Sequence, residues 1–443
     1  MPHPDDVLKR AADLLACPTP PLDRGEVDAF VQAFLDRRDQ FLGVCRRHGS
    51  PLYVLEPQVL RDRAAQFIAA FEDEVPDLRV YYAVKSNNSP AVAATLAEAG
   101  LGLDVSSGRE LEMALACGAD DIVFSGPGKT QAELALAVAS RERVTLLIDS
   151  FGELERLEAV AAEVGTTMRA GVRLTTDERG LWRKFGIPLT HLAGFLDAAD
   201  ACPHVRLCGL QFHTSWNLSP AAHVRFITRL GAELGTLDAR CRATIEFVDI
   251  GGGFWPSGGE WLQPEGTPEG ALLRAVGVPA ESPRRPHKLP AVPIGEFARQ
   301  VGAAVRTHLL PHVRCRICAE PGRWLCHDAM HIVLTVVDRK GDDIAITDAG
   351  TNALGWERFE TDYFPVINLS RPALAERECY VLGSLCTPHD VWGYAYYGTD
   401  ICPGDILLIP TQGAYTHSLR QEFIKPLPDV AILPDAPLDL PRL

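Results

Sequence analysis

The feature that most constrains the fold is a regular alternation of short apolar runs with amphipathic stretches from about residue 78 onward. The early runs recur about every 20 to 25 residues, which is the length of one βα unit. The runs expected to be strands are Val80–Val84, Leu103–Val105, Ile122–Phe124, Leu146–Ile148, Ala170–Leu174, Cys208–Phe212, Phe247–Ile250 and Arg316–Glu320. Eight strands alternating with helices predict a parallel sheet closed into a (β/α)8 barrel. Periodicity alone leaves an open doubly wound sheet as the alternative.

The rest of the chain has a different character. After residue 320, β-branched runs separated by polar or glycine-containing turns predict a mainly antiparallel β domain. With 443 residues, the chain is longer than one hydrophobic core usually organises. We expect a helical extension over 1–46, the barrel over 47–325, and the β domain over 326–443 with a strand contributed from about 50–56. The stretch between Trp255 and Pro293 is rich in Pro and Gly, and is interpreted as an elaborated loop within the barrel.

Composition argues against several kinds of partner. The formal charge of −15 argues against nucleic acid, because phosphate binding needs clustered Lys and Arg. No apolar run approaches the roughly 20 residues that span a bilayer, and no basic-then-apolar signal opens the chain, so we expect a cytoplasmic location and no membrane. Cys315 and Cys318 form a C-x-x-C pair without a second pair nearby, which favours buried thiols over a metal site.

The carboxyl ends of the predicted strands carry residues suited to chemistry. In a (β/α)8 barrel the active site lies at this face. The first strand is followed by Lys85, the second contains Asp104, and the sixth is followed by His213. A lysine there is an amine for Schiff-base chemistry, or else it emerges into solvent at the rim. His213 is a catalytic group or a hydrogen-bonded core histidine.

Groups that suit a phosphate and a pyridine ring follow the last two strands. Gly251-Gly252-Gly253 lets backbone amides approach a phosphate closely, although a tight turn explains three glycines equally well. Glu320 and Arg323 are separated by Pro-Gly; a carboxylate can hold a pyridine nitrogen protonated and Arg can bind phosphate. A surface ion pair is the alternative. Each feature is ambiguous alone, but together at one face they indicate a cofactor site.

The same residues lie in motifs that resemble those of the alanine-racemase-type (fold-type III) family of pyridoxal-phosphate enzymes, in its diaminopimelate and ornithine decarboxylase branch. The resemblance covers roughly residues 50 to 425. The motifs, in order, are Tyr82–Asn87, Asp104–Glu110, Lys184–Ile187, Phe212-His213, Asp249–Phe254, Glu320–Arg323, Cys386 with Asp390, and Gly413–Thr416.

The resemblance implies a role for each matching residue. Lys85 would hold pyridoxal 5'-phosphate as a Schiff base, His213 would stack on the ring, and Glu320 would pair with the pyridine nitrogen. The residues implied to bind the phosphate are Gly251, Gly252, Gly253 and Arg323, with Tyr415 nearby; Gly322 is also implied to bind the cofactor. Asp104, Glu110 and Arg173 would line the site and support Lys85 and His213. Cys386, from the β domain of a second subunit, would donate a proton after carbon dioxide leaves, which implies a homodimer with shared active sites.

The positions implied to contact the substrate depart from the family pattern. Ornithine-type members place an acid after the site cysteine and another after a Tyr, where this chain has Thr387 and Phe364, the latter after Tyr363. Diaminopimelate decarboxylases place a Glu after the cysteine and an Arg before the Tyr; Thr387 replaces that Glu, and Arg358 lies one residue from the Arg position. The substrate-binding residues implied by the resemblance are Arg358, Tyr363, Phe364, Thr387, Asp390 and Trp216.

These departures favour a decarboxylase acting on a specialised or conjugated amino acid in a siderophore or natural-product pathway. An ordinary diaminopimelate decarboxylase of lysine biosynthesis is the first alternative. A racemase of the same fold is the second; such racemases place Arg against the pyridine nitrogen, so Glu320 argues against it. A non-catalytic homologue is the third, and the retained Lys85, His213 and Cys386 argue against that.

Overall fold

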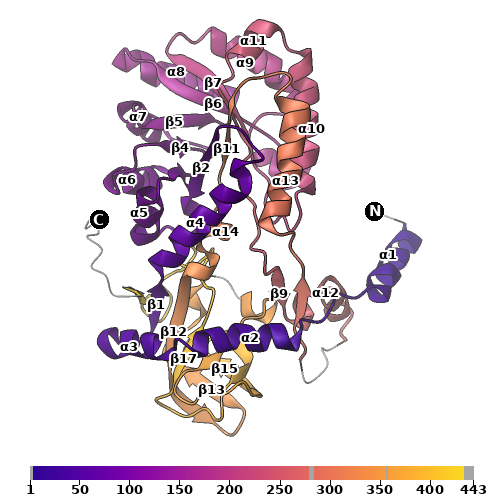
Figure 1. Cartoon of the computed structure of the whole chain (residues 1–443), viewed down its shortest axis with the longest axis vertical. Coiled ribbons are helices and arrows are strands. Elements are labelled where there is room, and N and C mark those ends of the chain that lie inside the picture. The colour runs from indigo at the N-terminus through magenta and orange to yellow at the C-terminus, as the bar shows by residue number, and fades with distance from the viewer. Residues whose placement is uncertain (1–2, 279–283, 356–357, 434–443) are drawn as a thin grey trace. The chain divides into compact units, whose positions relative to one another are not determined.

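The computed structural model describes residues 3–278, 284–355 and 358–433, which group into two compact units (Figure 1). The β unit takes in the described residues of the segments 3–57, 258–291 and 327–433. The barrel unit takes in the segments Gln58–Ser257 and Val292–Cys326.

The barrel unit is built on a closed sheet of eight parallel strands, in the order β11-β2-β3-β4-β5-β6-β7-β8. The strands are β2 (Leu78–Ala83), β3 (Gly102–Val105), β4 (Ile122–Phe124), β5 (Val144–Ile148), β6 (Met168–Leu174), β7 (Val205–Phe212), β8 (Phe247–Asp249) and β11 (Arg316–Ala319). Each strand coincides with a predicted run to within three residues at either end. The predicted (β/α)8 barrel is therefore confirmed, and the pairing of β11 with β2 closes the sheet that an open fold would leave unpaired.

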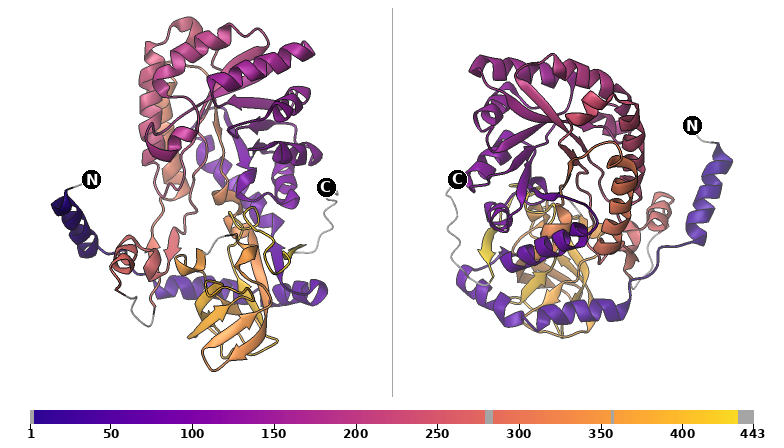
Figure 2. Two further views of the ribbon diagram at one scale, coloured as in Figure 1. Left: turned by 180° about the vertical axis from the view of Figure 1, so that it is seen from behind. Right: turned by 45° about the horizontal axis from the view of Figure 1, so that its top comes forward.

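Helices follow the strands and surround the sheet (Figure 2). They are α5 (Pro90–Glu98), α6 (Gly108–Ala116), α7 (Gln131–Ala139), α8 (Phe151–Val164), α9 (Leu192–Asp200), α10 (Ala221–Thr236) and α13 (Ile294–Ala304), with α4 (Pro57–Glu72) before β2 and the short α11 (Ala239–Ala243) and α14 (Arg323–Cys326). Ser107, Thr130 and Ser150 cap α6, α7 and α8 by accepting a hydrogen bond from a first-turn N–H. These caps start the helices soon after β3, β4 and β5, so the loops after these three strands are short.

Apolar side chains fill the interior of the barrel. One buried cluster consists of Tyr81, Val123, Leu147, Cys208, Phe247 and Cys318. Phe247 occupies the room left by two glycines: a Cβ on Gly209 would lie 2.0 Å from its ring, and a Cβ on Gly171 would lie 2.9 Å from it. The interior is thus a packed core rather than a channel, and polar groups gather at the carboxyl ends of the strands.

The β unit contains an eight-stranded sheet in the order β13-β15-β16-β14-β17-β12-β1-β18. Its strands are β1 (Leu52–Leu55), β12 (Met330–Lys340), β13 (Ile344–Thr347), β14 (Ile367–Asn368), β15 (Glu376–Leu382), β16 (Val391–Tyr397), β17 (Ile406–Ile409) and β18 (Asp429–Ile432). Most neighbours pair antiparallel, and β1 enters between β12 and β18. The mainly antiparallel sheet domain is confirmed.

The N-terminal helices share the core of the β unit. They are α1 (Pro4–Ala16), α2 (Arg24–Leu35) and α3 (Arg38–His48). Val31 and Phe41 are fully buried in one cluster with the strand residues Val54 and Val333, and Figure 1 shows α2 and α3 beside the sheet. The helical character expected for 1–46 is present, but α2 and α3 are part of a domain core rather than an appendage.

The segment 258–291 also differs from its sequence-based interpretation as a barrel loop. It carries β9 (Glu260–Leu262), α12 (Pro268–Ala275) and β10 (His287–Leu289), with β9 and β10 paired antiparallel. Gln263 N–H donates to Thr361 O at 2.8 Å, and Thr19 N–H donates to Glu269 at 2.7 Å. Because these partners belong to distant parts of the chain, the segment groups with the β unit, an assignment that local sequence does not reveal.

None of the twelve cysteines forms a disulfide, and Cys318 of the C-x-x-C pair is buried. Within the described segments, no helix combines the length and apolar character needed to cross a membrane, and no group of three or more His, Cys, Asp or Glu side chains is placed to hold a metal ion.

Candidate active site

A lysine–carboxylate pair lies where β2 and β3 end. Lys85 belongs to a 3-10 turn directly after β2, and its Nζ donates to Asp104 Oδ2 at 2.8 Å. The Asp104 side chain is fully buried, and Ser125 Oγ donates to its other oxygen. Burial raises the pKa of Asp104, and the nearby Glu320 carboxylate raises it further, whereas Lys85 lowers it. Lys85 is thus held at the barrel mouth by a buried partner, while about a third of its own side chain is exposed (32%).

A group of buried acids occupies the ends of β8 and β11. Gln211 Nε2 donates to Glu320 Oε1 at 3.2 Å, and the Glu320 side chain is fully buried. Asp249 Oδ1 accepts from Gly251 N–H at 2.8 Å. Burial and the neighbouring Glu320 charge raise the pKa of Asp249 well above its ordinary value. Asp249 therefore resists ionisation more than an exposed carboxyl group does, and Glu320 is the second acid at this end of the barrel.

His213, directly after β7, lies between Glu320 and the glycine turn. Its Nδ1 is 3.3 Å from Glu320 Oε2, and Gly252 N–H approaches the same nitrogen at 3.2 Å. Burial lowers the pKa of His213 well below 6.5, and the charges of Lys85 and Arg173 add to this effect. The ring is therefore neutral near pH 7 and able to lie against an aromatic cofactor without introducing a charge.

The three glycines after β8 form a turn that leaves no space for side chains. Gly251 and Gly253 have φ values of +69° and +90°, which side-chain-bearing residues rarely adopt. A Cβ on Gly251 would lie 2.3 Å from Phe212 O, one on Gly252 2.5 Å from Glu320 O, and one on Gly253 2.3 Å from Thr214 O. The backbone is thus bare at the end of β8, as a phosphate-binding turn requires.

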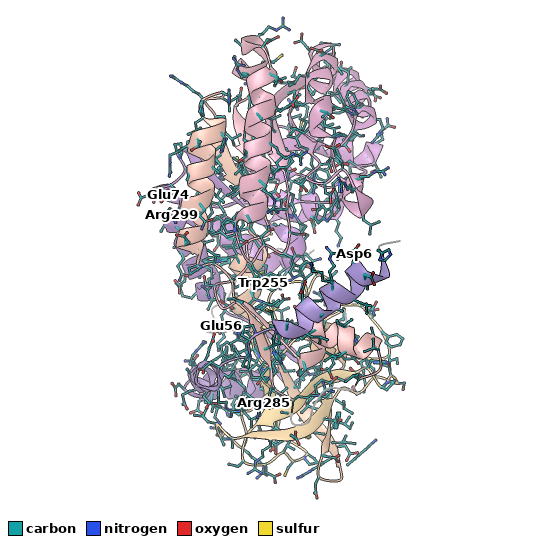
Figure 3. The ribbon with its side chains drawn as sticks, turned by 90° about the vertical axis from the view of Figure 1, so that its right-hand side faces the viewer. Asp6, Glu56, Glu74, Trp255, Arg285 and Arg299 are labelled. Atoms are coloured by element: carbon teal, nitrogen blue, oxygen red, sulfur yellow. The ribbon has the colours of Figure 1, made fainter. Side chains whose placement is uncertain are left out.

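Arg323 lies beside two tryptophans. Its guanidinium carbon is 4.4 Å from the centre of the Trp255 ring and 5.6 Å from that of Trp216 (Figure 3 labels Trp255). The two indole rings are 6.1 Å apart and nearly parallel, and Trp216 is 59% exposed. The indoles orient the guanidinium from one side. Within this unit, Trp216 contacts a residue expected to bind phosphate, so its position fits the cofactor end of the site as well as the substrate end.

Two supporting residues act through the backbone. Arg173, in β6, donates to Ser125 O at 3.2 Å and lies over the Phe185 ring at 4.6 Å. Glu110 accepts from Ser106 N–H at 2.7 Å. Both stabilise loops next to the Lys85–Asp104 pair, which agrees with a supporting role.

The remaining predicted residues lie in the β unit. Cys386 is exposed in a loop after β15. Asp390 is buried, and its two oxygens accept from the N–H groups of Thr351 and Leu385, each at 2.7 Å. Asp390 thus shapes the loop that carries Cys386 and Thr387, and its contact with the substrate stays a prediction.

The segment expected to select the substrate is partly buried. Tyr363 is 7% exposed and its hydroxyl donates to Glu376 at 3.0 Å, so it packs as a core residue of the β unit. The Phe364 ring is 5.0 Å from that of Phe359. Tyr415 has a φ of +58° in the loop after β17. The side chain of Arg358 lies outside the described part of the structure.

Sequence analysis missed three polar residues of the site: Ser125, Gln211 and Asp249. Each lies in or directly after a barrel strand, and Gln211 and Asp249 stand two residues before His213 and Gly251. Since alternate residues of a strand share a face, this spacing is a signal for Gln211 and Asp249 once the strand bounds are known from the structure; it gives no signal for Ser125.

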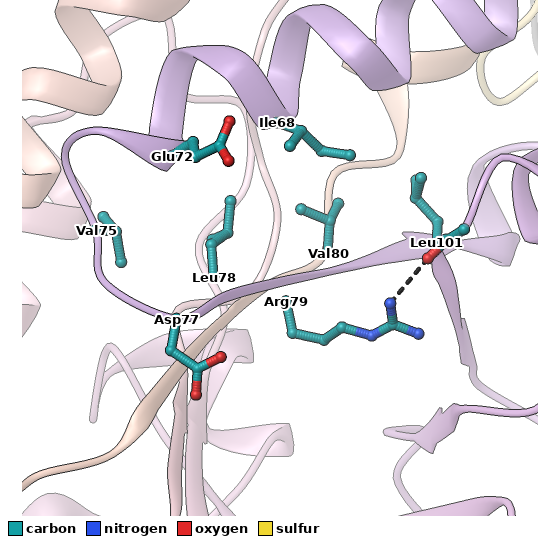
Figure 4. A pocket seen from close by; sticks show the side chains of 9 residues that line it. Ile68, Glu72, Val75, Asp77, Leu78, Arg79, Val80 and Leu101 are labelled. Carbon is teal, nitrogen blue, oxygen red and sulfur yellow. Dashed lines mark hydrogen bonds between the residues drawn. The ribbon is translucent and has the colours of Figure 1, made fainter.

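A separate hollow of about 310 Å³ lies at the other end of β2, between α4 and the amino end of the strand (Figure 4). Its lining includes Ile68, Glu72 and Arg79, and Arg79 donates to Gly100 O at 2.8 Å. Because barrel enzymes carry their chemistry at the carboxyl ends, this hollow is not the candidate site.

Comparison with known proteins identifies the family of this chain. A family model described as the pyridoxal-binding domain of pyridoxal-dependent decarboxylases matches residues 61–327. The chain belongs to this family. The predicted family and its decarboxylase class are thereby confirmed, and the racemase alternative is set aside.

Similar decarboxylases match over most of their length. Diaminopimelate decarboxylase of Vibrio cholerae is 29% identical over 401 residues, covering 86% of each chain. L-glutamyl-[BtrI acyl-carrier protein] decarboxylase of Niallia circulans is 26% identical over 404 residues, covering 85% of this chain and 86% of its own. The structure of Helicobacter pylori diaminopimelate decarboxylase complexed with L-lysine has a TM-score of 0.73 at 21% identity, covering 89% of this chain and 94% of its own, which supports the fold.

The cofactor of this family, pyridoxal phosphate, fits the residues present. The barrel unit offers an amine with a buried acid partner, a carboxylate for a pyridine nitrogen, and a turn whose glycine positions leave no room for a Cβ. The protein is accordingly a pyridoxal phosphate-dependent amino-acid decarboxylase. When bound, the cofactor draws electrons from the substrate and thereby stabilises the charge left as carbon dioxide departs.

Proposed function

We propose that this enzyme removes the α-carboxylate of a specialised or conjugated amino acid whose distal end carries no free ammonium. Lys85 is the residue that joins the cofactor. The observation that carries this assignment is the hydrogen bond of 2.8 Å between Lys85 Nζ and the fully buried Asp104 at the mouth of the barrel. A buried carboxylate next to a lysine amine holds that amine in one position at the barrel mouth, where it would meet the cofactor.

The surrounding residues divide the remaining work. Glu320, held by Gln211, would keep a proton on the pyridine nitrogen and so strengthen electron withdrawal. His213, neutral because its pKa is lowered, packs against the ring without competing for that proton. Arg323 and the end of the glycine turn, where the Gly253 N–H has no acceptor among the described residues, bind the phosphate, with Tyr415 in support.

Cys386 is the proton donor that completes turnover, and it acts in the site of a second subunit. Its exposure in the β unit supports this role, because a thiol that serves a partner's site is uncovered in its own chain. The enzyme is therefore a homodimer with shared active sites. The reaction is carried out in the cytoplasm on a small amino-acid substrate.

The substrate assignment rests on the positions implied to contact its distal end. Thr387 and Phe364 carry no charge, so an ammonium buried there would lack a carboxylate partner. The relative from Niallia circulans is named for a glutamyl group joined to a carrier protein, a substrate with a conjugated end. Diaminopimelate is the second candidate, because several similar proteins are named diaminopimelate decarboxylases.

A carbon dioxide release assay separates these candidates. We would compare diaminopimelate, ornithine and lysine with α-amino acids whose distal group is acylated or held as a thioester. The proposal predicts turnover of a distally blocked amino acid in preference to the free diamino acids. Preferential turnover of diaminopimelate would overturn the substrate assignment.

The variant Thr387→Glu sharpens the test. It returns the acid that diaminopimelate decarboxylases carry after the site cysteine, so we expect it to lower kcat/KM for the blocked substrate and raise it for diamino acids. Thr387→Val, which adds no charge, is the matched control.

A further inference from the structure

His223 is a buried histidine that the proposed chemistry does not use. It lies on α10, is fully buried, and packs against the rings of Phe254 at 5.2 Å and Phe297 at 5.4 Å. Its Nε2 lies 3.1 Å from Gly252 O, in the middle of the glycine turn. A carbonyl oxygen only accepts, so Nε2 carries the proton in this contact.

The imidazole is neutral. Burial lowers the pKa of His223 to about 3, so the ring carries one N–H rather than two near pH 7. The Thr214 hydroxyl lies 3.4 Å from the ring nitrogens and accepts from Asn217 Nδ2 at 2.8 Å. With the Nε2 proton directed to Gly252, the side chain acts as a fixed donor.

Each carbonyl of the glycine turn has its own donor. Glu320 N–H donates to Gly251 O at 2.8 Å, and Asn217 N–H donates to Gly253 O at 3.0 Å. His223 supplies the third donor, to Gly252 O. The first two donors are backbone N–H groups, so His223 is the side-chain donor among these three.

The direction of these carbonyls determines the direction of the next N–H groups. In a trans peptide the C=O of one residue and the N–H of the next point in opposite directions. The N–H of Gly253 therefore points away from His223, and that of Phe254 points away from Asn217. Among the residues that the structure describes, neither N–H has a hydrogen-bond acceptor, whereas Gly252 N–H is directed to His213.

We propose that His223 is a positioning residue that holds the Gly252 carbonyl and thereby presents the Gly253 N–H to the phosphate of the cofactor. This inference rests on the proposed function of the glycine turn and adds a residue outside it. His223 touches neither the phosphate nor the substrate. Its removal frees the Gly252–Gly253 peptide to rotate, so the loss falls on the phosphate end of the cofactor.

Two substitutions distinguish the contribution of the His223 N–H from that of its ring. His223→Phe keeps a ring that can stack on Phe254 but removes the donor, whereas His223→Gln keeps an N–H donor and loses the ring. Phe297→Leu is the matched control, because Phe297 packs on His223 and makes no hydrogen bond to the glycine turn.

The measurement is the affinity of the full-length chain, freed of cofactor with hydroxylamine, for pyridoxal phosphate and for pyridoxal, which lacks the phosphate. Visible absorbance follows both titrations. We expect His223→Phe to reduce the preference for pyridoxal phosphate over pyridoxal about tenfold, while His223→Gln stays within about threefold of the native chain. Phe297→Leu should lower the melting temperature and leave the preference unchanged.

The outcomes are distinct. A preference unchanged in His223→Phe, or lowered equally in Phe297→Leu, would overturn the positioning role and make His223 a packing residue. Equal loss of affinity for both ligands would do the same, because a general packing defect does not depend on phosphate. Failure of the native chain to bind either ligand would instead count against the proposed function.

Discussion

Single residues set the charge state of the site through burial. His213 and His223 are both buried and have lowered pKa values, whereas the pKa values of Asp104 and Asp249 are raised. The site is thus poor in charge where the cofactor ring is expected, apart from the Lys85–Asp104 pair and Glu320. Such an arrangement concentrates the effect of the few charges that remain.

Neutral buried histidines make the fold sensitive to acid. Below pH 6.5 an unfolded His223 takes up a proton, while the folded residue does not until about pH 3. Stability is therefore lost as pH falls through this window, by roughly 1.4 kcal/mol per pH unit for each such histidine. Chemical denaturation between pH 7 and pH 4 measures the slope.

His223→Gln removes this titrating group, so the change in unfolding free energy per pH unit should fall by the contribution of one proton. Phe297→Leu, which changes the packing around His223 without removing a titrating group, is the control and should leave the slope unchanged. Equal slopes in the native chain and His223→Gln would contradict the neutral state of the buried ring.

The site residues differ in how readily they can be predicted from the sequence. Lys85, His213 and Glu320 directly follow apolar runs, so the strand-end rule finds them. Gln211 and Asp249 lie within strands, where one polar residue in an apolar run does not reveal which face it occupies. The resemblance implies Asp390 as a substrate-binding residue, whereas its hydrogen bonds to backbone N–H groups depend on tertiary structure.

At the scale of elements, the glycine turn after β8 connects a barrel strand to the proposed phosphate site. Parallel strands buried on both faces are apolar runs, so the eight barrel strands can be read from sequence. The hairpin of β9 and β10 could not be predicted from the sequence, because its residues are mostly half-buried and its partners lie near residues 20 and 361.

Gly253→Ala tests the turn. The substitution imposes the left-handed penalty and places a Cβ 2.3 Å from Thr214 O, so we expect a loss of about 2–4 kcal/mol in unfolding free energy and weaker cofactor binding. Gly118→Ala is the matched control: its φ is +76° and no atom lies within 4 Å, so it should cost about 1 kcal/mol and leave cofactor affinity intact. Equal effects of the two substitutions would show that the close approach at Gly253 has no role.

At the scale of the whole molecule, each proposed active site requires two chains. Lys85 belongs to the barrel unit and Cys386 to the β unit, and the proposal places them in one site from different subunits. This arrangement is an expectation from family resemblance, since sequence carries no direct signal of which chain supplies a residue.

Mixing two inactive variants tests the shared site. Lys85→Ala and Cys386→Ala chains, each inactive alone, should form mixed dimers with one intact site. Random association of equal amounts should restore about a quarter of native carbon dioxide release. Lys85→Ala mixed with the double variant Lys85→Ala/Cys386→Ala provides the control, because no intact site can form. Recovery equal to this control would contradict shared sites.

The most direct test of the central claim is to identify the residue that holds the cofactor. Borohydride reduction of the purified holoenzyme fixes the cofactor to its lysine, and peptide mass spectrometry then locates the added mass. We expect a single labelled site at Lys85, with no label on the buried Lys129, which donates to Glu153 at 2.8 Å. Label on a different lysine, or none at all, would contradict the assignment of Lys85.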